Sequence, residues 1–294
     1  MLRRRGASAA EAIVALVLGA LVLGAATSSL LRQQRTTVAL DHGVQGAQQL
    51  HAATALLVAQ LELAAPGAWD LRAGEVRDTA LQLRATVASG VACDSGADVR
   101  IVVPADTITP SGVGSLPRAG DSLWWYRPDS ARWVGGRLTA VTGDSGDCPA
   151  LGITAAARAP LLRFRLASSD AGGARAAAGT PLRVTREMRW SVYRSGDGSW
   201  QLGVREWNDD AQALASIQPV AGPLQRVAPD GVRSGFRYFD ATGTELSPGA
   251  DSGARLRIAR IRVTAVAPAA PGGTTPAPPL RDSVDIAVRP ATGP

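Results

Sequence analysis

The chain has 294 residues, 46% of them hydrophobic, and its mean hydropathy of +0.04 fits one globular domain with a membrane segment and argues against a disordered chain. All 31 basic residues are Arg, and without the N-terminal Arg3, Arg4 and Arg5 the chain carries 28 basic against 25 acidic residues, a net charge of +3. Because this balance lacks the concentrated basic face of a dedicated nucleic-acid binder, nucleic acid is not an expected partner.

The first predicted element is a membrane-spanning helix. Residues 12–31 contain no charged side chain, and at 1.5 Å per residue these twenty residues extend about 30 Å, the thickness of a hydrocarbon core. Basic residues precede this stretch and the next one is Arg32, which favours a cytoplasmic N-terminus. We therefore expect a single-pass inner-membrane protein with a periplasmic C-terminal domain.

The helix is expected to continue beyond the membrane, since no Pro occurs before Pro66. Apolar residues recur near helical spacing at Val38, Leu40, Val44, Ala47, Leu50, Leu57 and Leu61. The pattern predicts one helix over residues 7–63, with a transmembrane half at 7–31 and an amphipathic half at 32–65 that packs on a domain. A secretory signal cleaved near residues 25–29 is the alternative, but the apolar run is long and continues into a helical polar segment.

Glu11 lies near the start of this apolar helix. An ionised carboxylate in hydrocarbon costs several kcal/mol unless it is paired, so a Glu in this place indicates a function. The alternative is a Glu that reaches out to the membrane interface in an ordinary single-span anchor.

From about residue 66 the sequence changes to short runs rich in Val, Ile, Arg and Trp, separated by Gly, Pro, Asp and Ser, which predicts a β-rich domain over residues 66–294. Strands are predicted at residues 81–87, 99–103, 122–126, 133–141 and 161–166. The clearest hairpin joins residues 184–194 and 200–207. By two-residue alternation, one apolar face contains Val184, Met188, Trp190 and Val192 in the first strand and Trp200, Leu202 and Val204 in the second.

Two further strands are predicted near the C-terminus. In residues 255–266 the apolar side chains occupy even positions up to Ile258 and odd positions from Ile261. A bulge near Ala259 and Arg260 is therefore expected, because it would keep the apolar side chains of both parts on the inner face. The last strand covers residues 280–289. Between them, residues 268–279 are too rich in Pro and Gly to fold compactly and are predicted to form an exposed loop, with residues 171–180 as a second such stretch.

The N-terminus resembles that of the prepilin family of type IV pili and type II secretion pseudopili, which have a short basic leader, a Gly and then a Glu at the fifth mature position. Here the leader is residues 1–6 and Glu11 is the fifth residue after Gly6, while Ala7 stands where the family usually has Phe. The resemblance implies cleavage after Gly6 by a prepilin peptidase and N-methylation of Ala7. It also implies that Glu11 pairs with the new α-amine in an assembled filament.

The chain also resembles J-type minor pseudopilins and W-type minor pilins, on residues 31–35, 231–240 and 258–266. The resemblance implies a pilin-like α+β fold, in which a long N-terminal helix packs on an antiparallel β-rich domain. The expected partners are other pilin or pseudopilin subunits, prepilin peptidase, inner-membrane lipid and the pilus assembly platform.

Few residues suggest chemistry elsewhere. Cys93 and Cys148 are the whole thiol inventory and are expected either to form a disulfide in an oxidising compartment or to remain buried thiols. Asp144 and Asp147 offer oxygen ligands to Ca²⁺, but they lack the usual loop with a terminal Glu, so a solvated turn is preferred and no metal site is predicted. His42 and His51 are nine residues apart on the helix, on opposite sides, and cannot share a metal.

Two surface features have open interpretations. The run from Trp124 to Tyr126 is either a contact patch for a neighbouring subunit or part of the core. With the expected bulge, one exposed face would carry an anion- or DNA-binding stripe of arginines, for which a solvated sheet face is the preferred alternative; its members are Arg255, Arg257, Arg260 and Arg262.

The sequence contains no HExxH, P-loop, GxSxG or CxxC motif, and neither catalysis nor a cofactor is expected. The prediction is therefore a noncatalytic minor pilin or pseudopilin subunit near the tip of a type IV pilus or type II secretion pseudopilus. One alternative is an uncleaved inner-membrane protein with a periplasmic binding module. A DNA-uptake minor pilin is the other.

Overall fold

The computed structural model describes residues 9–62, 71, 76–94, 98–102, 116–130, 132–144, 146–152, 161–167, 176–247, 254, 257–267 and 281–288. Helix α1 is Ala9–Glu62, and a short 3₁₀ helix, η2, is Pro149–Leu151. The strands are β1 (Ala80–Ala92), β2 (Asp98–Val102), β3 (Ser122–Arg127), β4 (Arg132–Asp144), β5 (Leu161–Leu166), β6 (Pro181–Arg194), β7 (Trp200–Asn208), β8 (Ala213–Leu214), β9 (Gln218–Leu224), β10 (Gly235–Phe239), β11 (Glu245–Leu246), β12 (Arg260–Val266) and β13 (Arg281–Ala287).

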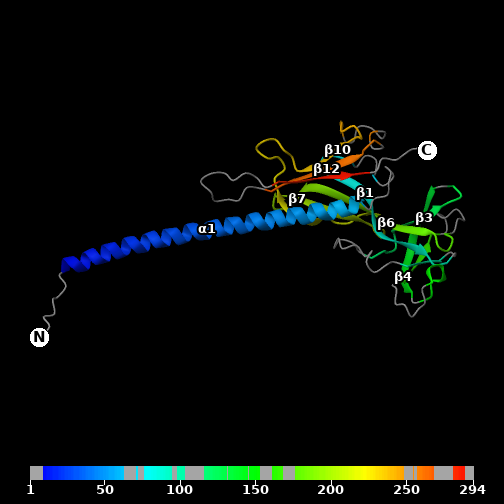
Figure 1. Ribbon diagram of the computed structural model, residues 1–294, viewed down its shortest axis with the longest axis horizontal. Coiled ribbons are helices and arrows are strands. Elements are labelled where there is room, and N and C mark those ends of the chain that lie inside the picture. The colour runs from blue at the N-terminus through cyan, green and yellow to red at the C-terminus, as the bar shows by residue number, and fades with distance from the viewer. Residues whose placement is uncertain are drawn as a thin grey trace.

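The predicted single helix is confirmed as the 54-residue α1, which projects far beyond one end of a β-rich body (Figure 1). Its C-terminal part packs against β13, β9 and β1 through Ala53, Leu57 and Leu61, which are at most 3% exposed. The expectation that the whole amphipathic half packs on the domain is wrong. Val38 and Val44, both counted on its apolar face, are each 54% exposed, because the body begins to cover the helix only near Ala53.

Nine strands form the larger sheet, in the order β1-β2-β5-β4-β3-β6-β7-β8, with β9 added beside β7. Because β1 also pairs with β6, six of these strands close on themselves in a ring, β1-β2-β5-β4-β3-β6. All pairings are antiparallel. The ring places β3 and β4 at the end of the body opposite the free part of α1 (Figure 1).

Strand β6 belongs to two parts of this sheet. One of its edges pairs with β1 from Pro181 to Ser191. Its other edge pairs first with β3, from Leu182 to Thr185, and then with β7, from Met188 to Arg194. The sheet therefore forks at residues 186–187, where β3 turns into the closed ring and β7 diverges from it.

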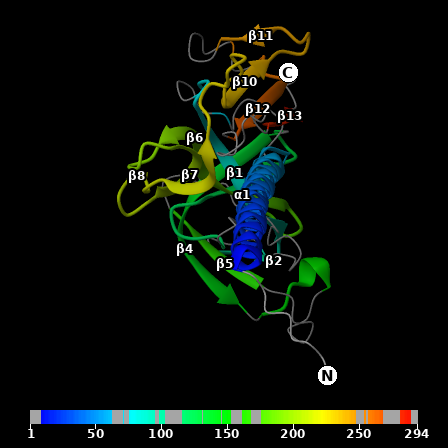
Figure 2. The same cartoon turned by 90° about the vertical axis from the view of Figure 1, so that its left-hand side faces the viewer.

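The smaller sheet has the order β11-β10-β12-β13. Backbone hydrogen bonds connect it to the larger one, from Phe236 N–H to the Asp78 carbonyl at 2.9 Å and from Gln225 N–H to the Val266 carbonyl at 2.7 Å. In the view along the helix, α1 lies below β12 and β13 and in front of β1 (Figure 2). One continuous hydrophobic core joins α1 and both sheets.

The structure confirms the predicted strands at β1 to β5, with changes of up to five residues at their ends, and the hairpin of β6 and β7. Strands β8 to β11 were not predicted. In β9, Pro219 and Pro223 hide the strand pattern, because Pro cannot donate to a ladder. The change of parity near residue 259 is observed with both Ile258 and Ile261 buried, but the continuous strand β12 starts only at Arg260. The predicted loop at 268–279 lies outside the described residues.

In the closed ring of six strands, Gly135 on β4 lies opposite Trp124 on β3. A Cβ at Gly135 would lie 2.5 Å from the indole of Trp124. The indole is held in place by its Nε1–H, which donates to Thr185 Oγ1 at 2.9 Å. We expect Gly135→Ala to lower the free energy of unfolding by about 1–3 kcal/mol through overpacking. Urea unfolding of the detergent-solubilised chain measures this. Gly143→Ala is the control on the same strand, since its Cβ would meet nothing within 4 Å, and an equal loss there would contradict the explanation.

Candidate functional site

Most of the exposed large hydrophobic side chains among the described residues lie on the free part of α1. Within α1, Ala12–Gln34 is a 23-residue window of mean hydropathy 2.2 with no part buried, long and apolar enough to cross a membrane. Leu16 and Leu23 are 74% and 69% exposed. The hydroxyls of Thr27 and Ser28 donate to helix carbonyls at 2.8 and 2.9 Å, which satisfies their hydrogen bonds inside an apolar medium.

The predicted processing residues are only partly covered by the structure. Gly6 and Ala7 lie outside the described residues. Glu11 lies in the first turn of α1, next to the apolar window, and its side chain is outside the described part. The geometry thus places Glu11 on the helix that carries the apolar segment.

The other end of α1 is fixed to the smaller sheet by a polar contact. Thr54 Oγ1–H donates to Asp282 Oδ2 at 2.8 Å, and both groups face each other between α1 and β13. His51 Nδ1 lies 3.9 Å from the same carboxylate, although its side chain is 84% exposed. The side chain of His42 is not described.

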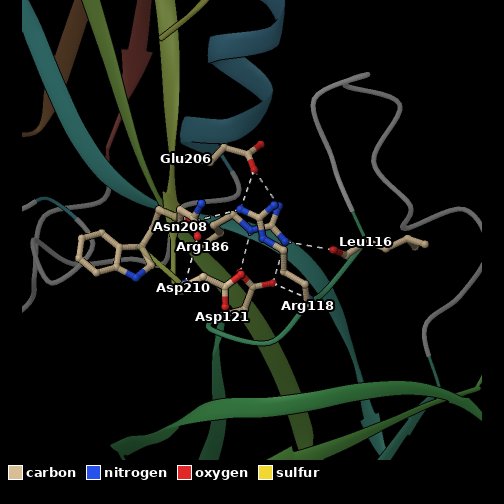
Figure 3. Close-up of polar contacts among 8 residues, drawn as sticks. Leu116, Arg118, Asp121, Arg186, Glu206, Asn208 and Asp210 are labelled. Atoms are coloured by element: carbon tan, nitrogen blue, oxygen red, sulfur yellow. Dashed lines mark hydrogen bonds and ion pairs between the residues drawn. The ribbon is translucent and has the colours of Figure 1, made fainter. Parts of the chain in front are cut away.

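A buried ionic cluster occupies the fork of the larger sheet (Figure 3). Arg186 on β6 is 1% exposed and donates from Nε and Nη2 to the two carboxylate oxygens of Asp121, at 2.7 and 2.8 Å. It also donates to Glu206 Oε2 on β7 at 3.0 Å and to the Leu116 carbonyl at 3.0 Å. Arg118 Nη2 lies 3.2 Å from Glu206, so two cations balance two carboxylates.

The cluster is placed by the strands around it. Asp121 directly precedes β3, Glu206 is on β7, and Arg186 is in the gap between the parts of β6 that pair with these two strands. Burial lowers the pKa of the Arg186 guanidinium, but the hydrogen bonds and charges of Asp121 and Glu206 outweigh it and raise the pKa above its ordinary value. The guanidinium is therefore a permanent charge that connects β3, β6 and β7.

Sequence reasoning missed this cluster although a signal was present. Arg186 has the same parity as Val184 and Met188 on β6, and Glu206 has the same parity as Val204 on β7. Two opposite charges on the apolar faces of one hairpin indicate a buried pair. Arg186 makes four hydrogen bonds and its charge is paired with carboxylates, which is typical of a structural role.

The predicted arginine stripe is only partly assembled. Arg255 lies outside the described residues, and Arg257 precedes β12. Arg260 and Arg262 share the outer face of β12, and both approach Asp285 on β13: Arg262 at 2.6 Å and Arg260 at 3.6 Å. The hydrogen bond from Arg262 is the main cause that lowers the pKa of Asp285. Asp285 therefore compensates part of the positive charge expected of the stripe.

An aromatic ring lies beneath these arginines. Phe239, 6% exposed, faces the guanidinium carbons of Arg260, Arg262 and Arg237 at 4.5, 5.3 and 5.5 Å. Arg237 pairs in turn with Glu245. Three arginines thus lie over the phenyl ring, and two carboxylates pair with them. This arrangement is as consistent with a solvated sheet face as with an anion site.

The candidate calcium ligands and the two cysteines are the remaining predicted site residues. Asp144 pairs with Arg163 at 2.9 Å and accepts from Gly146 N–H, as in a turn. In the part of the chain that the structure describes, no three His, Cys, Asp or Glu side chains converge to hold a metal ion. Cys93 and Cys148 form a disulfide with a Cα–Cα distance of 4.8 Å.

The aromatic run on β3 divides between the core and the surface. Trp125 is 1% exposed and belongs to the core. Tyr126 meets Trp133 of β4 edge to face with ring centroids 5.8 Å apart, and Trp133 is 45% exposed. The core interpretation therefore holds for Trp125, and the Tyr126–Trp133 pair remains the part accessible to a partner.

Comparison with known proteins found no family model, no curated protein and no solved structure that matches the chain.

Proposed function

We propose that this chain is a noncatalytic pilin-like subunit. The apolar segment of α1 anchors it in the inner membrane, prepilin peptidase cleaves after Gly6, and α1 then enters the core of a type IV pilus or type II secretion pseudopilus. The β-rich body is displayed on the filament, near its tip. The chemistry is done by the peptidase on this chain, and the chain itself serves as a building block.

The observation that carries the proposal is the continuity of α1. One helix includes Glu11, the exposed apolar window Ala12–Gln34 and the buried residues Leu57 and Leu61 of the domain core. The same helix is therefore both a membrane segment and a structural part of the body. Cleavage of a secretory signal near residues 25–29 would cut this helix within its regular part, so the continuity favours a leader that ends before the helix.

The proposal predicts that removing the Glu11 carboxylate blocks assembly and leaves the chain intact. In cells with a prepilin peptidase, Glu11→Ala should still give a mature chain that starts at Ala7, by intact-mass analysis of the membrane fraction. Its recovery in sheared filaments should fall by about tenfold or more, because each ~1.4 kcal/mol of lost pairing changes an equilibrium tenfold.

Asp41→Ala is the matched control, since Asp41 is an exposed carboxylate on the same helix beyond the apolar window. It should change neither cleavage nor recovery. A wild-type chain that retains Met1 would favour the uncleaved anchor over the proposed function. Equal filament recovery for Glu11→Ala and the wild type would show that Glu11 is not needed for assembly.

A further inference from the structure

Between the apolar window and the body lies a stretch of α1 whose described side chains are covered by neither. The window ends at Gln34, and the first residues buried against the sheets are Ala53 and Thr54, 2% and 3% exposed. We call residues 35–52 the linker helix. At 1.5 Å per residue, the rise from Gln34 to Ala53 is about 28 Å. All linker side chains that the structure describes are exposed; they are Thr37, Val38, Asp41, Val44, Gln45, Ala47, Gln48, His51 and Ala52.

The linker helix contains residues that weaken an exposed helix. Gly43 and Gly46 each cost about 1 kcal/mol relative to Ala in an exposed helix, and Thr36, Thr37 and Val38 are also weak helix formers. Without tertiary burial, these losses are not offset by packing.

Charge pairs do not compensate either. The linker contains one acidic residue, Asp41, and its neighbours three and four residues away are Thr37, Val38, Val44 and Gln45, none of them basic. An exposed helix without such pairs depends on its intrinsic propensities alone, and in this stretch the two glycines lower them.

Both ends of the linker are better fixed than its middle. On the body side, Leu57 and Leu61 are buried, and Thr54 donates to Asp282 at 2.8 Å. On the other side, the apolar window retains its backbone hydrogen bonds once it lies in lipid, because no water competes for them there. Any bending of α1 therefore concentrates in residues 35–52.

We infer that the linker helix is a hinge, which opens locally around Gly43 and Gly46 and lets the β-rich body change its inclination to the membrane. The inference rests on the proposed function only in placing the apolar window in lipid, and it requires neither leader cleavage nor assembly. A hinge at this place serves the proposed function, because a body that swings can meet a neighbouring subunit at angles that a rigid 54-residue rod does not allow.

Hydrogen exchange of the full chain in lipid nanodiscs, followed by mass spectrometry, tests the hinge. Amides of residues 40–50 are expected to exchange much faster than those of residues 55–61, which belong to the buried part of the same helix. The double variant Gly43→Ala/Gly46→Ala should slow exchange in the linker about thirtyfold, since two substitutions of ~1 kcal/mol each multiply their effects.

Gly19→Ala is the control, because a Cβ at Gly19 meets nothing within 4 Å and the residue lies in the apolar window. It should leave exchange in the linker unchanged. Linker amides as protected as residues 55–61 in the wild type would overturn the hinge, as would a double variant with unchanged exchange. A protected linker in a chain that still matures at Ala7 refutes only the hinge, whereas a fast linker in a chain that keeps Met1 refutes only the proposed processing.

Discussion

Replacing Arg186 by Leu is expected to lower the free energy of unfolding by about 3–5 kcal/mol, because it leaves buried carboxylates without their cation. Asp121 is 3% exposed and receives two of the four hydrogen bonds that Arg186 donates. Glu206, whose side chain is 20% exposed, loses one of its two arginines. Urea unfolding of the detergent-solubilised chain, followed by tryptophan fluorescence, measures the loss.

The control is Arg237→Leu, which breaks an ion pair of the same type at the surface. Arg237 and Glu245 have side chains that are 53% and 47% exposed, and an exposed pair contributes at most about 1 kcal/mol. A similar cost for both variants would show that burial of Arg186 is not what matters. The variant Arg186→Leu/Asp121→Leu should recover part of the lost stability, since it removes the orphaned carboxylate together with its partner.

The position of Arg186 gives this cluster a second consequence. Strands β3 and β7 share one edge of β6, and the cluster fills the gap between their pairings. A stability loss in Arg186→Leu should therefore come with faster hydrogen exchange at the adjoining ends of β3 and β7. The long strands β1 and β6, which pair along eleven residue positions, should keep their protection.

The sequence predicted those elements whose signals are local. Helix α1 follows from its apolar run and the absence of Pro, and the β6–β7 hairpin follows from two-residue alternation around a Gly-rich turn. The ring of six strands could not be predicted, because its closure depends on pairing β1 not only with its neighbour β2 but also with β6, about a hundred residues further along the chain. Arg186 and Asp121 are 65 residues apart, so parity could have placed Arg186 inside but could not have named its partner.

The packing of α1 shows where periodicity is insufficient. Val38 and Val44 continue the apolar repeat that Leu57 and Leu61 bury, yet they remain exposed. Periodicity reports which residues share a face of a helix, but it does not report how far the partner surface extends. The size of the body, set by the folding of the sheets, decides that. For the same reason the sequence predicted the members of the arginine stripe but not Asp285, which faces two of them from β13.

Removing the disulfide is the second change with a large expected effect. Cys93 and Cys148 are separated by 55 residues, and closing a loop of that length lowers the conformational entropy of the unfolded chain by the equivalent of about 4 kcal/mol at 25 °C. The double variant Cys93→Ala/Cys148→Ala, which leaves no unpaired thiol, should lose free energy of unfolding of this order. Urea unfolding with and without a reductant measures it.

The disulfide also supports the weakest part of the ring. Among the described residues, β1 and β2 pair through two positions, Val91–Val102 and Ala92–Ile101, whereas β1 and β6 pair along most of their length. Cys93 directly follows β1 and is 3% exposed. The disulfide ties the end of β1 to the segment after β4. When the disulfide is removed, the ring of strands is therefore expected to open first between β1 and β2.

Hydrogen exchange distinguishes this local effect from a general loss of stability. In the double variant, β2 and β5 should exchange faster than the β6–β7 hairpin, which shares none of the tethered residues. The reduced wild type should reproduce this pattern, and the reductant should not change the variant further. A uniform increase over all strands would mean that the disulfide acts only through the unfolded chain, and unchanged exchange in β2 and β5 would show that the short β1–β2 pairing closes the ring without it.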